Sequence, residues 1–368
     1  MNKHITTHIG LDVHKSSTAI AVARQDRRAE FVGTVGAELK ELCQVLKQQG
    51  SSEAMRIVYE AGPCGYSLVR ALRARGYRCD VIAPAKVARR PGDRIKTDRR
   101  DALHLAEQSK AGALTAVWVL EEADEAIRDL SRAREDAVRA RLKARQQLQA
   151  MLLRYGHRYR GKTRWTAAHE RYLAQRSFPY PAQELAYVEY RQMASESHER
   201  VARITEALRE QVSTWRLQPV VAALMTLRGI DFVAATTLVA ELGDLRRFAH
   251  PRELMSFLGL VPSEHTSGNT RRLGAITRTG NGYARRMLVE AAWNYRFPAR
   301  ISRAIQQRQE GQPKAVRDIA WQAQTRLSRR YRALKARQVH HNKICVAVAR
   351  ELAGFVWAIA RRVDLPGT

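Results

Sequence analysis

The order of strand and helix signals in the first 110 residues is the feature that most constrains this chain of 368 residues. Three short apolar runs come first, and strand and helix patterns alternate after them. The predicted strands cover residues 8–13, 17–24, 30–35, 55–61 and 79–83. The first and third predicted helices cover residues 37–49 and 98–110. The second predicted helix runs through Leu68 and Leu72 to Gly76. This order predicts an α/β domain with a mixed sheet flanked by helices, followed by a mainly helical remainder.

Four carboxylates occupy distinctive places in this order. Asp12 ends the first strand, Glu60 ends the fourth, and Asp98 and Asp101 stand three residues apart at the start of a helix. The element order is also that of an RNase H/RuvC-like core, whose first and fourth strands are neighbours, so the four acids should converge. Clustered carboxylates repel one another unless a cation neutralises them. The pattern predicts a site for Mg²⁺ or Mn²⁺, where two ions about 3.5–4 Å apart can clamp both oxygens of a phosphoryl transfer.

Each acid also has an ordinary interpretation. Asp98 could cap the helix, with Asp101 in the favourable first turn, and Asp12 could be a turn residue. Glu60 is harder to explain in this way, because an apolar strand that ends in Glu-Gly-Pro rarely needs an acid. The four together favour the metal site.

The charge of the chain predicts a polyanionic partner. It carries 64 Lys and Arg against 36 Asp and Glu, a formal net charge of +28. Each phosphate that Lys or Arg neutralises releases counterions, so nucleic acid is the expected partner. Ribosomal and chromatin proteins share this charge, but they tend to be short or of low complexity. Basic residues also surround the third acid: Lys86, Arg89, Arg90, Arg94, Lys96, Arg99 and Arg100. We expect Lys96, Arg99 and Arg100 to contact nucleic acid, against the alternative of a solvated loop.

The sequence favours a cytoplasmic protein without membrane attachment. The polar start, residues 1–8, lacks a signal-peptide core, and the apolar stretch 344–363 is interrupted by charges. The cysteines are scattered, without a CxxC pair: Cys43, Cys64, Cys79 and Cys345. They are typical of buried thiols in a reducing compartment.

The middle of the chain predicts two long helices. The first carries a narrow seam at steps of four and three residues: Ala126, Leu130, Ala133, Ala137, Ala140, Ala144, Leu148, Met151 and Tyr155. The second carries an amphipathic face: Val201, Ile204, Leu208, Val212 and Trp215. Two arrangements fit this pattern, an antiparallel hairpin within one chain and a dimerisation arm.

A compact segment follows from Pro219. Residues 224–242 predict a helix-hairpin-helix, in which the backbone N–H groups around Gly229 could meet a phosphate. A loop is expected over residues 262–280, and a helix is expected to open near Asn281. The last part, from residue 301, is basic and helical.

Several stretches resemble the DEDD transposases of the IS-one-ten (IS110) type, relatives of the Piv DNA invertases. In the first part they are GLDVHK, YEAGPCGY and IKTDRRDALHLA. In the second part they are LMTLRGIDFVAATTLVAELGDLRRF and SFLGLVPSEHTSGNTRRLGAITRTGNGYARRMLVEAAW. The two matches cover about 1–110 and 220–297, in the order and spacing of the family.

The resemblance implies a domain division and a function. It implies a RuvC-like DEDD domain at 1–115, a coiled-coil region at 116–217, a transposase domain at 218–300 and a basic extension at 301–368. It also implies an enzyme that cuts and rejoins donor and target DNA, directed by a structured bridge RNA. A homo-oligomer acting at the bacterial nucleoid is expected.

The resemblance further assigns site residues. It maps the four acids of the family onto those identified above and points to Ser267 as nucleophile, with Ser263 and Ser256 as alternatives. Gly268 leaves room for a phosphate that Arg271 and Arg272 could hold, and His265 could carry a proton: these residues surround Ser267. Without the resemblance, a Ser-Gly pair would be read as a turn.

The acids and Ser267 are far apart in the sequence, so they would have to meet across a domain interface or between protomers. Two rival functions stay open. One is a RuvC-like nuclease that uses water as nucleophile, and the other is a basic nucleic-acid-binding protein whose acids are structural.

Overall fold

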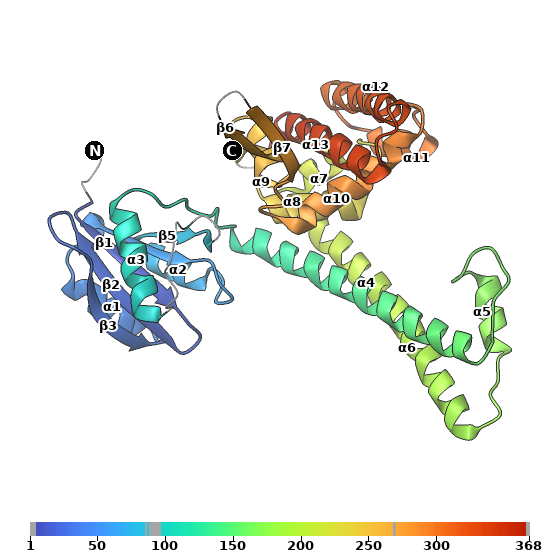
Figure 1. Cartoon of the computed structure of the whole chain (residues 1–368), viewed down its shortest axis with the longest axis horizontal. Coiled ribbons are helices and arrows are strands. Elements are labelled where there is room, and N and C mark those ends of the chain that lie inside the picture. The colour runs from blue at the N-terminus through green and yellow to red at the C-terminus, as the bar shows by residue number, and fades with distance from the viewer. Residues whose placement is uncertain (1–4, 85–86, 88–96, 268–269, 366–368) are drawn as a thin grey trace. The chain divides into compact units, whose positions relative to one another are not determined.

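The computed structural model describes residues 5–84, 87, 97–267 and 270–365. The chain divides into two compact units, Met1–Leu120 and Glu121–Thr368, and each is described by itself (Figure 1). The predicted fold class, an α/β domain before a mainly helical region, is confirmed.

The first unit is built on a five-stranded mixed sheet in the order β3-β2-β1-β4-β5. Its strands are β1 (Thr7–Val13), β2 (Ser17–Arg24), β3 (Glu30–Gly36), β4 (Met55–Glu60) and β5 (Arg78–Ile82). β1 pairs antiparallel with β2 and parallel with β4. The predicted adjacency of the first and fourth strands is therefore confirmed, and their carboxyl ends lie at the same edge of the sheet.

Helices cover both faces of this sheet. They are α1 (Leu39–Gln48), α2 (Ser67–Arg73) and α3 (Asp98–Lys110), with a 3-10 turn at η1 (Ser52–Ala54). Ile9, Leu11, Ile57 and Tyr59 share a core with apolar residues of α1 and α2. Because side chains alternate along a strand, the intervening residues of β1 and β4 face the other side, which α3 covers.

Small residues let α3 lie unusually close to the sheet. The buried residues of the cluster between α3 and β2 are alanines from both elements: Ala19, Ala21, Ala23, Ala102 and Ala106. At Gly10 the approach is closest, because a Cβ built there would lie 2.2 Å from the carbonyl oxygen of Ala102. This contact brings the first turn of α3 towards the carboxyl ends of β1 and β4.

The second unit contains a long helical hairpin that we call the arm. Its helices are α4 (Glu122–Arg154) and α6 (Pro181–Ser213), which pack along each other, with α5 (Ala167–Ala174) between them in the chain (Figure 1). The antiparallel hairpin within one chain is observed, and the role of the arm in dimerisation stays a prediction.

The predicted seam of α4 is correct in part. Ala137, Ala144, Leu148 and Met151 are buried, as expected. Four predicted seam residues are exposed: Ala126, Ala133, Ala140 and Tyr155. In the first half of the helix the buried face instead contains Asp124, Ile127 and Ser131.

Two of these buried positions are polar, which is why apolar spacing did not reveal them. The carboxylate of Asp124 accepts a hydrogen bond from the indole of Trp215 at 2.8 Å and pairs with Arg216. Ser131 shares a hydrogen bond of 3.1 Å with Thr237 of the adjoining bundle. Buried polar groups are tolerated where they have such partners.

The base of the arm joins a helical bundle, which we call the C-terminal bundle. Its helices are α7 (Gln218–Leu224), α8 (Phe232–Leu242), α9 (Pro251–Phe257), α10 (Gly282–Ala292), α11 (Arg303–Gln309), α12 (Lys314–Ala336) and α13 (His341–Ala360). Short 3-10 segments lie between them at η3 (Leu245–Arg247) and η4 (Trp293–Arg296). The core is continuous across these helices apart from α11, and α13 buries one side along most of its length.

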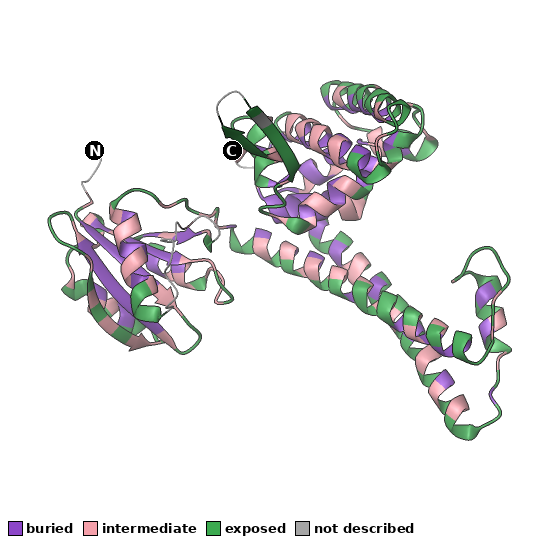
Figure 2. Ribbon diagram, in the orientation of Figure 1, coloured by how far each residue is buried: buried purple, intermediate pink, exposed green. Residues whose placement is uncertain are grey.

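The stretch expected as a loop over residues 262–280 is instead mostly a β-hairpin. β6 (Pro262–Ser267) pairs antiparallel with β7 (Thr270–Ile276). Figure 2 shows that the hairpin is largely exposed. Because neither strand has a strongly buried face, the alternation of apolar and polar residues that would have predicted strands is absent.

Among the helices of the described residues, none combines the length and apolar character needed to cross a bilayer.

Candidate functional site

The register of the sheet places two of the predicted acids side by side. In the parallel pairing of β1 with β4, Leu11 lies opposite Tyr59, and Asp12 and Glu60 are the next residues of the two strands. Leu11 and Tyr59 point into the core beneath α1 and α2. By alternation, Asp12 and Glu60 therefore face the side that α3 covers.

The first turn of α3 supplies the other two acids. Thr97, rather than Asp98, caps this helix, because its hydroxyl accepts a hydrogen bond from the backbone N–H of Arg100 at 3.3 Å. The capping interpretation of Asp98 is therefore wrong. Asp98 and Asp101 stand on the helix face that continues through the buried Ala102 and is directed towards the sheet.

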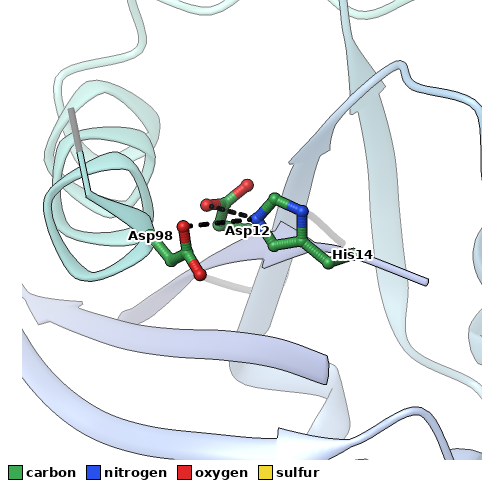
Figure 3. A group of neighbouring side chains, drawn as sticks. All are labelled: Asp12, His14 and Asp98. Atoms are coloured by element: carbon green, nitrogen blue, oxygen red, sulfur yellow. Dashed lines mark hydrogen bonds and ion pairs between the residues drawn. The ribbon is translucent and has the colours of Figure 1, made fainter. Parts of the chain in front are cut away.

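His14, which the sequence interpretation did not single out, lies next to the carboxylates of Asp12 and Asp98. The Nε2 atom of His14 is 3.2 Å from Oδ2 of Asp12 and 3.4 Å from Oδ1 of Asp98 (Figure 3). One potential ligand atom from each of the three residues lies within 4.8 Å of the others. The position of His14, two residues after a strand-ending acid, was the only available signal.

The electrostatics of Asp12 agree with a crowded acidic site. Burial raises the pKa of the Asp12 carboxyl above its usual value, and the charges of Asp101 and Asp98 raise it further, whereas His14 opposes the rise. The carboxylates of both α3 acids therefore act on Asp12. A divalent cation would relieve this repulsion.

The donor atoms fit such a cation. Carboxylate oxygens from β1 and α3 meet an imidazole nitrogen, a set that suits Mg²⁺, Mn²⁺ or another first-row ion. The side chains of His14 and Asp98 are 47% and 61% exposed, so a phosphodiester could reach an ion held there.

The predicted nucleophile lies in the second unit, at the tip of the β-hairpin. Ser267 is exposed and pairs with Thr270 across the two strands. His265 pairs with Arg272, and because side chains two residues apart share a strand face, these two lie on the same hairpin face as Ser267.

The two alternative serines have different surroundings. Ser263 is partly buried, and its hydroxyl lies where a side chain at Gly274 would have to go, 2.4 Å from the position of that Cβ. Ser256 is exposed on α9, one residue before the end of the helix. Neither lies at the hairpin tip.

Some predicted contacts cannot be placed. Lys96, Gly268 and the basic residues at 86, 89, 90 and 94 lie outside the described residues, as does the side chain of Arg271. Of the others, the guanidinium of Arg99 stacks on the ring of Phe31 at 5.3 Å, and Arg100 and Arg272 are exposed.

Gly229 has a packing role in addition to its predicted contact with phosphate. Its φ of 80° is left-handed, and a Cβ there would lie 2.6 Å from the carbonyl oxygen of Ala291. The turn is therefore pressed against α10. A cavity of about 430 Å³ lies beside it, lined in part by Arg134 and Arg141, while the contact with phosphate stays a prediction.

A second feature missed by the sequence interpretation is an ionic network at the base of the arm. The buried carboxylate of Glu241, on α8, accepts two hydrogen bonds from Arg132 of α4, at 2.7 and 2.8 Å. The side-chain amide of Asn281 donates a third, at 2.6 Å. No local pattern could reveal this network, because its members are distant in the chain.

Two family models match the chain. One, described as Transposase IS116/IS110/IS902 family, matches residues 221–307. The other, a DEDD transposase model of the IS110 type described as Transposase, matches residues 9–157 and so includes all four acids.

Similar proteins match over most of the length. A protein of Sinorhizobium fredii named "Putative transposase y4qE" is 46% identical over 96% of this chain and 88% of its own length. The transposase for insertion sequence element IS1533 of Leptospira borgpetersenii is 29% identical, over 90% and 97%. The transposase for insertion sequence element IS1111A of Coxiella burnetii is 24% identical, over 94% and 84%.

Proposed function

Because this chain belongs to the IS110 family of insertion-sequence transposases, enzymes that cut and rejoin DNA, we propose that it acts by metal-dependent phosphoryl transfer with Ser267 as nucleophile. The observation that carries the proposal is the meeting of Asp12 and Asp98, from elements far apart in the sequence, at one edge of the sheet. Glu60 and Asp101 are proposed to complete the metal site. Mg²⁺ and Mn²⁺ are the ions proposed.

The four acids are proposed to hold the divalent ion and to orient it towards the reacting phosphate. A divalent ion bound by them would polarise the phosphoryl oxygens and help to ionise the attacking hydroxyl. Strand pairing holds the backbones of Asp12 and Glu60, and the first turn of α3 holds those of Asp98 and Asp101. This support from regular elements favours the proposed four-acid site.

Ser267 is proposed to form a covalent intermediate. Its Oγ bonds to the phosphorus, the bond from phosphorus to the 3′ oxygen of the neighbouring nucleotide breaks, and the 3′ oxygen leaves as a hydroxyl after taking a proton from water. His265 takes the serine proton and Arg272 holds the phosphate oxygens, both from the hairpin face of Ser267. Arg271 is also proposed to contact phosphate. The phosphodiester energy is thereby kept for rejoining.

A bridge-type RNA and a homo-oligomer are also proposed. The net charge of +28 supports binding of RNA as well as donor and target DNA. Residues 1–115 are proposed as the metal-binding domain, 116–217 as the arm, 218–300 as the serine domain and 301–368 as a basic extension. Sequencing the RNA that copurifies with the protein tests the RNA proposal, and absence of a preferred RNA contradicts it.

The decisive experiment traps the reaction in denaturant and maps the modified peptide. We expect DNA attached to Ser267, and we expect Ser267→Ala to abolish both adduct and recombinant while changing stability by no more than about 0.5 kcal/mol, because the residue is exposed. Ser263→Ala and Ser256→Ala are matched controls that should keep the adduct.

The other outcomes separate the rival functions. An adduct on Ser263 would move the nucleophile within the hairpin. Metal-dependent nicking without any adduct would indicate a RuvC-like nuclease that uses water. Binding without cleavage would indicate a nucleic-acid-binding protein whose acids are structural.

A further inference from the structure

We infer that His14 is a metal ligand, so that the site combines carboxylate oxygens with one imidazole nitrogen. The inference rests on the proposed metal-dependent function and extends it, because the four acids alone would give an all-oxygen site. It predicts a preference for Mn²⁺ over Mg²⁺ in this chain.

The position of His14 is determined by the local fold. The residue follows β1 directly, and its backbone N–H donates a hydrogen bond to the carbonyl oxygen of Ser17 at 2.9 Å, which closes the tight connection to β2. Val13 and Thr18 form the last pair before this connection. The imidazole therefore stands beside the end of β1, where Asp12 also lies (Figure 3).

The distances fit shared coordination of one ion. In an octahedral site with bonds of about 2.1 Å, neighbouring donor atoms lie about 3.0 Å apart and opposite ones about 4.2 Å apart. Nε2 of His14 is 3.2 Å from the Asp12 oxygen and 3.4 Å from the Asp98 oxygen, close to the spacing of neighbouring ligands.

An ordinary ion pair explains this arrangement less completely. A single N–H at Nε2 can point well at only one acceptor, yet two carboxylates from different elements approach the same nitrogen. A divalent ion in the space between the three donors would interact with all of them at once.

The nitrogen donor has a consequence for metal choice. Mg²⁺ strongly prefers oxygen ligands, whereas affinity for imidazole increases from Mn²⁺ towards the later first-row ions. With His14 bound, the ratio of Mn²⁺ to Mg²⁺ affinity should be higher than the carboxylates alone would give.

The test uses the full-length protein and Mn²⁺ without nucleic acid. Electron spin-echo envelope modulation detects ¹⁴N bonded to Mn²⁺, and the signal should be present in the wild type and absent in His14→Gln. Calorimetry should show Mn²⁺ affinity lowered by at least about tenfold in that variant. His14→Asp should restore binding with an oxygen donor, without the ¹⁴N signal and with a lower ratio of Mn²⁺ to Mg²⁺ affinity.

His198→Gln, an exposed histidine on the arm, is the matched control and should leave signal and affinity unchanged. Mn²⁺ bound to the wild type without a ¹⁴N signal overturns the inference and leaves the proposed four-acid site intact. If the wild type binds neither Mn²⁺ nor Mg²⁺, the proposed metal-dependent function fails as well.

Discussion

At the scale of single residues, Gly10 shows how one missing side chain positions the acids. A Cβ there would lie 2.2 Å from the backbone oxygen of Ala102 and 2.5 Å from the backbone nitrogen of Ala106. Neither atom can move without displacing α3, and with it Asp98 and Asp101.

We therefore predict that Gly10→Ala lowers the free energy of unfolding by about 2–3 kcal/mol, as overpacking typically does. It should also weaken Mn²⁺ binding, because α3 must move away from β1. Gly62→Ala is the control, since its Cβ would come no closer than 4.0 Å to the nearest atom. Chemical denaturation measures both variants, and equal stability of the two would contradict the close packing of α3.

Asp12 is predicted to destabilise the metal-free protein. Burial raises the pKa of its carboxyl in the folded state, so ionising it opposes folding at every pH above that pKa. Asp12→Asn should therefore raise the melting temperature of the metal-free protein at pH 7. The difference should shrink as the pH falls and should vanish below about 4, where the wild-type carboxyl is protonated in both states.

With added Mn²⁺ the wild type should have the higher melting temperature, because it gains stability from binding the ion whereas Asp12→Asn gains little. Asp26→Asn, whose side chain is 79% exposed, should show neither effect. Calorimetric scans at several pH values, with and without Mn²⁺, would measure both. A wild type that is the more stable protein at neutral pH without metal would refute the prediction.

At the scale of elements, the junction of α4, α8 and α10 depends on Glu241. The Glu241 side chain is 1% exposed and accepts the hydrogen bonds of Arg132 and Asn281. Glu241→Gln keeps the shape of the side chain but removes its negative charge. It also turns an NH₂ group, a donor, towards the donor groups of Arg132 or Asn281. We expect a loss of about 3 kcal/mol, since breaking a buried pair leaves its partner unsatisfied.

Glu290→Gln provides the comparison within the same bundle. Its side chain is 61% exposed and pairs with Arg286 one helical turn away, so its loss should cost less than about 0.5 kcal/mol. Urea denaturation of both variants measures the difference. Similar losses would show that the network does not stabilise the junction.

The arm is the element most suited to the proposed oligomer. Large apolar side chains remain exposed on or beside its helices: Leu142, Leu153, Tyr155, Tyr180, Leu185, Val188 and Met193. We predict that replacing Leu142 and Leu185 together with Glu yields monomers in light scattering while helicity is retained, because both are more than half exposed.

Ala137→Glu is the contrasting variant. Ala137 is only 3% exposed, so a charge there should unfold part of the arm rather than merely separate protomers. An unchanged oligomer in the Leu142 and Leu185 double variant would assign the interface to another surface.

At the scale of the whole molecule, the net charge of +28 should dominate affinity for nucleic acid. If six to ten basic groups reach phosphates, affinity should fall by about 10³–10⁵ between 50 and 200 mM salt. Arg272→Gln should reduce the slope of log affinity against log salt by about one, as expected for the loss of one phosphate contact. Fluorescence anisotropy measures the affinity of both proteins at each salt concentration. An affinity that does not change with salt would show that the basic residues do not form the binding surface.

Much of the fold was predictable because its signals are local. Strand and helix periods in residues 1–110 specify the element order, and the order implies that β1 and β4 are neighbours. Asp12 and Glu60 lie near the carboxyl ends of those strands, so the prediction that they are neighbours follows from backbone pairing alone. Apolar spacing likewise predicted four buried residues of α4: Ala137, Ala144, Leu148 and Met151.

Only the tertiary structure decided the features that depend on partners distant in the chain. Asp124 and Ser131 take buried places on α4 because Trp215 and Thr237 satisfy them, which no apolar pattern can indicate. The β6–β7 hairpin lacks a buried face and so gave no strand signal. His14 lies close to Asp98 because α3 packs across β1 at Gly10. Periodicity therefore determined the elements, whereas packing and the pairing of polar groups determined which residues meet.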